Sequence, residues 1–126
     1  MIRLPIQVRY SDYDERGHVN NALYLTYFEL GRAAAWRALD GDATVGFIVA
    51  QATVQYRSPA RPGDPLALEI AAGEVRTRSW TWRYRVVDER DERLVAEGET
   101  VQVHYDYSAQ CTTPVPPALR ARLEAL

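Results

Sequence analysis

The chain has 126 residues, of which 47% are hydrophobic, so its length suits one globular domain over residues 1–126 and is short for two. Its fifteen basic residues, all arginines, are scattered among seventeen acidic residues at a formal charge of −2, which argues against a face that binds nucleic acid. One cysteine excludes an intrachain disulfide framework, and neither an export signal nor an apolar run of roughly 20 residues is present, so we expect a cytoplasmic protein without membrane contact.

A strand and a helix are predicted in the first third of the chain. Residues 3–10 alternate in polarity as a short strand does, and residues 12–19 form a polar connection. A helix follows from Asn20 or Asn21, because an asparagine side chain accepts a hydrogen bond from the exposed amides of a first turn. It continues to about Leu39, and its apolar side chains point several ways around the axis, which is typical of a helix that other elements surround.

The rest of the chain predicts mainly strands. The helix is expected to end at Asp40-Gly41-Asp42, and strands follow over Thr44 to Arg57 and Leu66 to about Arg78. Two further strands alternate in polarity, each with one apolar face: Trp80, Trp82, Tyr84 and Val86 in the fourth, and Val101, Val103, Tyr105 and Tyr107 in the fifth. The segment DERDER forms a charged turn between them, and residues 114–126 predict a tail with a short terminal helix.

This order of elements predicts an α+β fold, an antiparallel five-stranded sheet wrapped around one long central helix. A single helix cannot cover such a sheet completely. We therefore expect the uncovered edge or face to pair with a second copy of the chain, which gives at least a homodimer.

The polar connection concentrates chemistry that the rest of the chain lacks, and a metal site is one interpretation of it. Asp12-x-Asp14 with Gly17 has the beginning of a calcium loop, but Arg16 and Leu23 stand where such a loop needs an oxygen ligand and a bidentate glutamate. Zinc fits no better, because the histidines His18 and His104 and the thiol of Cys111 lack ligand spacing. We expect no metal and no cofactor.

Carboxylate chemistry is the remaining interpretation, since neither a nucleophile elbow nor a glycine-rich phosphate loop occurs. The start of a helix offers unpaired amides and a partial positive charge, which would keep a nearby aspartate ionised and polarise a bound carbonyl oxygen. The alternative is that Asp12, Asp14 and Glu15 only complement the helix dipole, each contributing about 0.3–1 kcal/mol. Spacing alone leaves both interpretations open.

One set of residues runs through the polar connection into the helix: Arg9-Tyr10-Ser11-Asp12-Tyr13-Asp14, Gly17-His18-Val19-Asn20-Asn21, Tyr24, Tyr27-Phe28-Glu29 and Arg32. This set resembles the 4-hydroxybenzoyl-CoA thioesterase-like group of hotdog-fold acyl-CoA thioesterases. Tyr56-Arg57-Ser58-Pro59-Ala60 with Gly63-Asp64 is similar to the segment between the second and third strands of that group. The resemblance covers nearly the whole chain and implies the hotdog fold.

The resemblance also implies roles for residues of the polar connection. Asp14 matches the catalytic carboxylate, which acts as a nucleophile or as a base toward water, with Asp12 in support. The main-chain amide of Asn21 matches the group that polarises the thioester oxygen, and Gly17 lets the chain pass close to the substrate. His18 is a further site residue, expected to orient or pack.

The string Gly17-His18-Val19-Asn20-Asn21 is also similar to plant-type acyl-carrier-protein thioesterases, which leaves that activity as an alternative. The catalytic asparagine of that family falls on Arg16 here, so its complete set of catalytic residues is absent.

Coenzyme A carries phosphates, and Arg76 and Arg78 resemble the basic stretch of the family before its fourth strand, with Arg61 a weaker candidate. Trp36, Trp82 and Tyr84 suit either an acyl pocket or the core. Glu29 is expected to pair with Arg32 one helical turn later, and a second catalytic role for Glu29 stays open.

The sequence therefore predicts an acyl-CoA thioesterase that forms a homodimer, with pairing of dimers into a tetramer left open. A hotdog domain that binds acyl-CoA or a protein partner without hydrolysis, and a hotdog dehydratase, are the other classes. The sequence decides neither the length nor the aromatic character of the acyl group.

Overall fold

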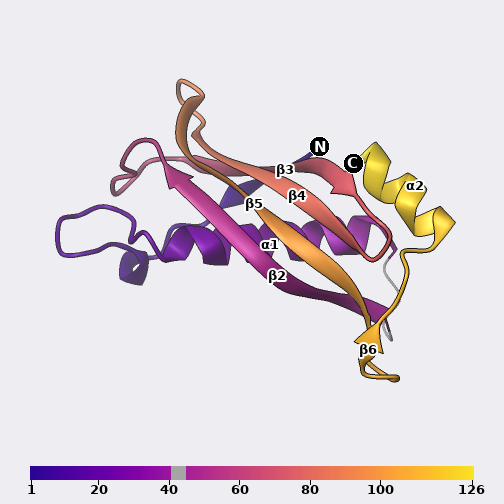
Figure 1. Ribbon diagram of the computed structural model, residues 1–126. Coiled ribbons are helices and arrows are strands. Elements are labelled where there is room, and N and C mark those ends of the chain that lie inside the picture. The colour runs from indigo at the N-terminus through magenta and orange to yellow at the C-terminus, as the bar shows by residue number, and fades with distance from the viewer. Residues whose placement is uncertain (41–44) are drawn as a thin grey trace.

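The strands of the described residues belong to one antiparallel sheet, whose order is β1-β3-β4-β5-β2 (Figure 1). The computed structural model describes residues 1–40 and 45–126. Its elements in chain order are β1 (Ile2–Ile6), the short 3-10 helix η1 (Tyr10–Asp12), α1 (Leu23–Ala38), β2 (Val45–Tyr56), β3 (Leu66–Val75), β4 (Ser79–Asp88), β5 (Arg93–Asp106), β6 (Cys111–Thr112) and α2 (Pro117–Ala125). The two-residue β6 pairs with the end of β5.

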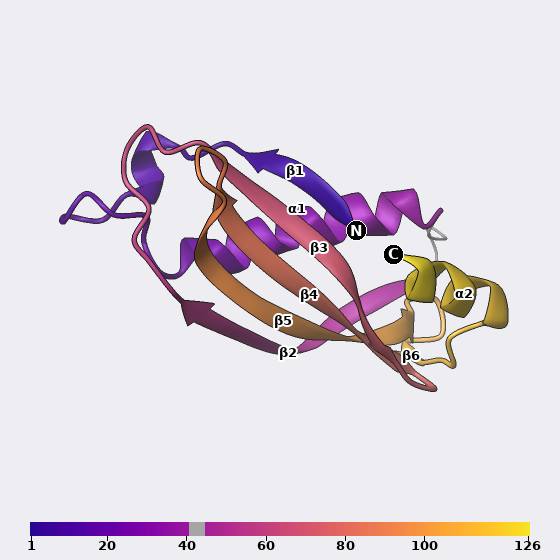
Figure 2. The same cartoon turned by 90° about the horizontal axis from the view of Figure 1, so that it is seen from above.

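Helix α1 runs along one face of the sheet, as Figure 2 shows, and it packs there against β1, β2 and β3. Phe28 stacks on Tyr84 of β4 with 4.3 Å between ring centroids, and Trp36 stacks on Trp80 at 5.9 Å. Gly31 lets the helix approach β3 closely, because a Cβ there would lie 2.7 Å from the Leu68 side chain. Burial of these aromatic surfaces holds the helix to the sheet.

The predicted α+β architecture with an antiparallel sheet is confirmed, and it agrees with the hotdog fold. A single long central helix is not confirmed, because α1 has sixteen residues and a second helix, α2, packs against β3. The helix begins later than predicted because Asn20 forms a turn before it. The Asn20 side chain accepts from the Ala22 N–H at 3.0 Å, and its carbonyl accepts from the Leu23 N–H.

The observed ends of β1, β3 and α1 differ from the predicted ends for local reasons. Strand β1 ends at Ile6, because its partner there, Leu66, is the first residue of β3. Strand β3 ends at Val75, since the Arg76 N–H bonds to the Ser79 carbonyl and closes the turn into β4. Helix α1 ends before Asp40, which has φ of +51°, whereas Gly41, Asp42 and Thr44 lie outside the described residues.

The apolar face predicted for β4 is buried, whereas the polar face of β5 is the one turned inward. Trp80 lies opposite Gln102, and Trp82 lies opposite Thr100. Because directly opposed residues share a sheet face, the register turns Thr100, Gln102 and His104 toward the core and leaves the apolar set of β5 half-buried or exposed. The Thr100 hydroxyl compensates by bonding to Tyr84 at 2.6 Å.

Among residues 1–40 and 45–126, no helix combines the length and apolar character needed to cross a membrane.

Gly98 of β5 is predicted to be required for packing. A Cβ at this position would overlap the main-chain oxygen of Thr53 and crowd the Phe28 ring, so Gly98→Ala should lower the free energy of unfolding by about 1–3 kcal/mol. Gly46→Ala in β2 is the matched control, because its Cβ meets only the ring of Tyr107, which is 55% exposed and can move aside. Urea denaturation measures both, and equal stability of the two variants would contradict the packing argument.

Candidate active site

The polar connection between η1 and α1 folds back on itself as a tight hairpin. Tyr13 and Val19 form an isolated antiparallel bridge, and the Asp14 N–H donates to the His18 carbonyl at 2.7 Å. Gly17 reverses the chain with φ of +75°, a left-handed conformation that side chains disfavour, while its N–H donates to the Asp14 carbonyl. Glycine at position 17 therefore sets the shape of this loop.

The hairpin holds one oxygen of Asp14 and leaves the other free. Oδ1 accepts main-chain hydrogen bonds from Arg16 at 2.9 Å and His18 at 3.1 Å. The His18 N–H is the main cause that lowers the pKa of Asp14, and the Arg16 N–H adds to it against the opposing effect of desolvation. Asp14 is therefore ionised at neutral pH, and within the described part of the chain Oδ2 has no hydrogen-bond partner.

Asp12 has a different environment from Asp14, with an exposed fraction of 1%. Its carboxylate accepts from the Arg9 main chain and guanidinium at 3.0 Å each and from the Tyr27 hydroxyl at 2.9 Å. Desolvation opposes its ionisation, but these hydrogen bonds prevail and hold its pKa below the usual value. Asp12 thereby ties η1 to α1, a structural position from which no free oxygen faces solvent.

The start of α1 presents an unused main-chain donor. The Asn20 N–H donates to the Asp12 carbonyl, and the N–H groups of Ala22 and Leu23 both bond to Asn20. The Asn21 N–H, between them, donates to no acceptor in residues 1–40 and 45–126, while the Asn21 carbonyl accepts from the Tyr56 hydroxyl at 2.9 Å. A free N–H at a helix start is suited to bind an oxygen atom with negative charge.

A cavity of about 380 Å³ joins these groups. Its walls are formed by Asp14, His18, Val19, Asn21, Tyr24, Tyr56, Arg57, Ser58 and Pro59. The structure thus brings three predicted residues, Asp14, His18 and Asn21, to one cavity, with Asp14 exposed at its rim. Gly17 lies on the other side of the loop, where with Asp14 and Tyr10 it lines a separate hollow.

The cavity wall formed by Ser58 and Pro59 is held by hydrogen bonds from Arg93 at the start of β5. Arg93 donates to the Ser58 hydroxyl at 2.6 Å and to the Pro59 carbonyl at 3.1 Å. Arg93 is itself held by Asp88, whose pKa lies well below its usual range because the side chain and main chain of Arg90 bond to it. The Val19 N–H donates to the Ala60 carbonyl and joins this wall to the hairpin.

Sequence reasoning gave no role to Tyr24, Tyr56 or Arg57, although all three line the cavity. The sequence does contain a signal, because these residues belong to the segments that resemble the thioesterase family. What it could not supply was the contact between them: the Tyr24 and Tyr56 rings meet edge to face at 5.6 Å, across 32 positions of chain.

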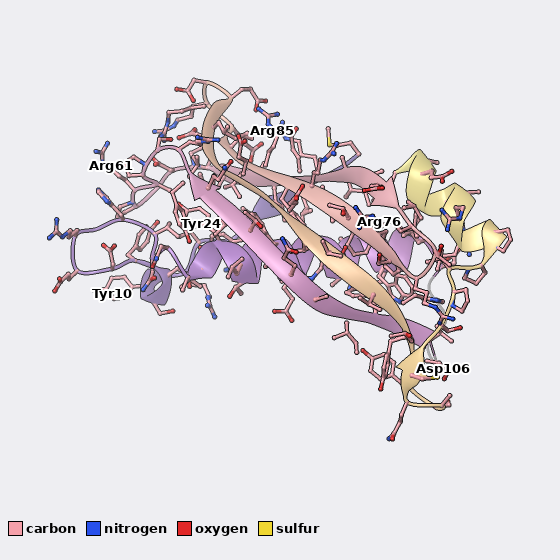
Figure 3. All side chains as sticks on the ribbon, viewed as in Figure 1. Tyr10, Tyr24, Arg61, Arg76, Arg85 and Asp106 are labelled. Atoms are coloured by element: carbon pink, nitrogen blue, oxygen red, sulfur yellow. The ribbon has the colours of Figure 1, made fainter. Side chains whose placement is uncertain are left out.

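The predicted phosphate-binding residues lie far from the cavity within one protomer. Arg76 pairs with Glu74 at 2.9 Å, and Arg78 donates to the Thr112 carbonyl at 3.1 Å. Figure 3 shows Arg76 at the α2 end of the sheet, whereas Tyr24 and Arg61 lie at the opposite end. Arg61 is exposed near the cavity, and its main-chain N–H donates to Asp64.

Packing resolves two other expectations. Trp82 and Tyr84 are fully buried core residues, and Trp36 joins an aromatic cluster with Phe47 and Trp80 rather than the cavity. The predicted Glu29–Arg32 ion pair is absent from the described residues, since Arg32 instead lies beside the Tyr84 hydroxyl. Across the described ranges no group of three or more histidine, cysteine, aspartate or glutamate side chains is arranged to hold a metal ion.

The chain is similar to known proteins along most of its length. A profile of the thioesterase-like superfamily matches residues 8–123. The acyl-CoA thioester hydrolase YbgC of Escherichia coli O6:H1 is 31% identical over 113 residues, which cover 84% of this chain and 83% of that protein. A thioesterase from Thermus thermophilus, solved with coenzyme A and Zn, superposes with a TM-score of 0.87 at 29% identity, covering 98% of this chain and 91% of that one. The PA5185 protein from Pseudomonas aeruginosa PAO1 superposes with a TM-score of 0.91 at 22% identity, covering 100% and 91%, and shows the fold alone.

Asp12 is predicted to stabilise the protein only above the pH at which it ionises. Its lowered pKa means that the unfolded chain takes up a proton first, so the contribution is complete above 3.8 and is lost as the pH falls below that value. Asp12→Asn should lower the free energy of unfolding by about 2 kcal/mol at pH 7. In urea denaturation its deficit should shrink at pH 3, and a deficit that stays constant with pH would contradict this assignment.

Proposed function

This chain belongs to the thioesterase-like superfamily of hotdog-fold acyl-CoA thioesterases and is a thioester hydrolase, and we propose that Asp14 and the Asn21 N–H cleave acyl-CoA substrates. The observation that carries the proposal is one cavity bordered by both groups. Asp14 contributes an ionised carboxylate with Oδ2 free, and Asn21 contributes a donor with no protein acceptor among the described residues.

In the proposed reaction the thioester oxygen accepts the Asn21 N–H, and the positive end of the α1 dipole adds to its polarisation. Oδ2 of Asp14 then attacks the carbonyl carbon, or it takes a proton from a water molecule that attacks. Both routes break the carbon–sulfur bond and release coenzyme A as a thiolate, which takes up a proton. The base route gives the free acid directly, whereas attack by Oδ2 leaves an acyl anhydride on Asp14, which a water molecule hydrolyses to the free acid and the carboxylate. Two protein groups are enough for this reaction, because a thioester carbonyl has little resonance stabilisation and thiolate is a good leaving group.

Gly17 and His18 have supporting roles in this proposal. Gly17 forms the turn that brings the His18 N–H to Asp14, and this N–H together with that of Arg16 fixes the orientation of the carboxylate. The His18 imidazole borders the cavity, where it packs against or orients the substrate.

A homodimer is proposed because one edge of the sheet is unprotected. The β1 edge is five residues long and contains Pro5, which limits its pairing. The β2 edge has twelve residues without proline, and three of its apolar side chains are exposed: Ile48 by 44%, Val49 by 38% and Tyr56 by 48%. We propose that β2 pairs antiparallel with β2 of a second copy, with pairing of dimers left to measurement.

Such a dimer would bring Arg76 and Arg78 to the active site of the partner. The Tyr56 end of β2 lies at Asn21, whereas the Val45 end pairs with Asp106. Arg78 belongs to the Val45 end, since its carbonyl accepts from the His104 N–H. Antiparallel pairing about a two-fold axis reverses these ends, so the partner's arginines move toward the cavity, where they would bind the phosphates of coenzyme A.

Asp14→Asn is predicted to reduce kcat by at least about 100-fold while the fold is retained, because the amide can still accept the Arg16 and His18 N–H groups but cannot act as nucleophile or base. Release of free thiol from a panel of acyl-CoAs measures the effect. Asp91→Asn, which removes an exposed carboxylate in the β4–β5 turn, is the control and should match the unaltered protein. A folded Asp14→Asn protein with full activity would refute the role of Asp14.

A mixed dimer tests whether the arginines act across the interface. Arg76→Glu with Arg78→Glu in one subunit should raise KM about 10-fold or more, through repulsion of phosphate. In the proposed dimer each site takes Asp14 from one subunit and the arginines from the other. A heterodimer of the arginine variant with an Asp14→Asn subunit would therefore have one site with both defects and one intact site. Such a heterodimer, purified through two different tags, should retain about half of the unaltered activity. A heterodimer in which both sites are impaired would mean that Asp14 and the arginines of the same subunit act together. Light scattering that shows only monomer would exclude the β2–β2 dimer.

A further inference from the structure

Tyr24 lies in the first turn of α1 and forms part of the cavity floor. Its side chain is only 3% exposed, and its ring is fixed by edge-to-face contacts with Tyr27 at 5.8 Å and Tyr56 at 5.6 Å. Helix side chains lean toward the helix N-terminus, so Tyr24 leans toward the turn that carries Asn21. Tyr24 therefore has a defined position in the pocket.

The three tyrosines around this cavity differ in how their hydroxyls are used. The Tyr27 hydroxyl donates to Asp12 and the Tyr56 hydroxyl donates to the Asn21 carbonyl, each at 2.9 Å. The Tyr24 hydroxyl has no hydrogen-bond partner within residues 1–40 and 45–126. The enclosed side-chain polar atoms without a partner in the described residues belong to Trp80, Trp82 and Gln102, so the Tyr24 hydroxyl still faces the cavity and can donate to a ligand that displaces water there.

The groups that line the cavity differ in how deeply they are buried. Asp14 is exposed at the rim, whereas Tyr24 is buried at the floor. The large, charged coenzyme has to stay outside with the exposed arginines, so the acyl group is the part of the substrate that passes Asp14 and reaches Tyr24. The partner of the Tyr24 hydroxyl is consequently an atom of the acyl group rather than the coenzyme.

The chemistry of that atom follows from the state of the hydroxyl. Burial raises the pKa of Tyr24 to about 12, so at neutral pH the group is an O–H donor. The nearby Ser58 hydroxyl does not compete with it, because it donates to the Leu94 carbonyl at 2.8 Å and accepts from Arg93. The complement of an unpaired donor is an oxygen acceptor.

We propose that the Tyr24 hydroxyl donates a hydrogen bond to a keto or hydroxyl oxygen on the acyl group, so that the enzyme selects oxygenated acyl-CoAs over plain ones of equal length. The inference rests on the proposed function, because it takes the cavity as the acyl site. A plain acyl group would leave the hydroxyl unpaired, and this loss is the source of the discrimination.

Kinetics with matched substrates test the proposal. The pairs are acetoacetyl- or 3-hydroxybutyryl-CoA against butyryl-CoA, and 4-hydroxybenzoyl-CoA against benzoyl-CoA. In at least one pair the unaltered enzyme should prefer the oxygenated member by about 10-fold in kcat/KM, and Tyr24→Phe should reduce that preference to within about 2-fold while plain substrates change little. Tyr10→Phe, which removes a hydroxyl from an exposed side chain outside this cavity, should leave the preference intact.

Non-hydrolysable thioethers separate this inference from the proposed function. S-(3-oxobutyl)-CoA against S-butyl-CoA, and S-(4-hydroxybenzyl)-CoA against S-benzyl-CoA, can be compared by calorimetry whether or not thiol release is found. Tyr24→Phe should weaken binding of the oxygenated member selectively. If every pair gives the same Kd ratio in the unaltered protein and in Tyr24→Phe, the Tyr24 hydroxyl does not bind an oxygen of the acyl group, even if hydrolysis by Asp14 is found.

Discussion

The carboxylate of Asp12 is enclosed where η1, the hairpin loop and α1 meet, and a charge in such a place must be matched by donors. Arg9 and Tyr27 supply them, so η1 is fixed to the second turn of α1. The carbonyl of Asp12 also accepts the Asn20 N–H, which sets the entry into the helix. The position of the free Asn21 N–H therefore depends on this one buried carboxylate.

Asp14, the second acid of the pair, is exposed whereas Asp12 is buried. The main-chain N–H groups of Arg16 and His18 and the turn at Gly17 hold it in this position. Asp14 points away from the core, and the left-handed turn at Gly17 returns the His18 N–H to its Oδ1. Main-chain donors then keep the carboxylate ionised and oriented without enclosing it. Two aspartates spaced two residues apart thus divide into one that fixes the loop and one that is left free for chemistry.

Local patterns predicted the strand and helix order, the buried face of β4 and the residues of the hairpin, because each depends on neighbours in sequence. The inward face of β5 was not predictable: Val101 and Val103 alternate as a core face does, and only pairing with Trp80 and Trp82 reveals that Thr100 and Gln102 point inward. The place of Tyr24 in the cavity escaped for the same reason, since its neighbour Tyr56 comes from a distant strand. Arg76 and Arg78 lie at the end of the sheet opposite the cavity, and the proposed pairing of two copies is what would bring them to it.

The central claim is that the start of α1 polarises the substrate carbonyl while Asp14 faces it. Difference infrared spectroscopy of a carbonyl-13C-labelled acyl-CoA bound to Asp14→Asn protein, in which hydrolysis is slowed, measures this directly. The account predicts that the thioester carbonyl stretch moves to lower wavenumber on binding than in water, since the Asn21 N–H weakens the double bond. A stretch unchanged from water, or moved to higher wavenumber, would contradict it.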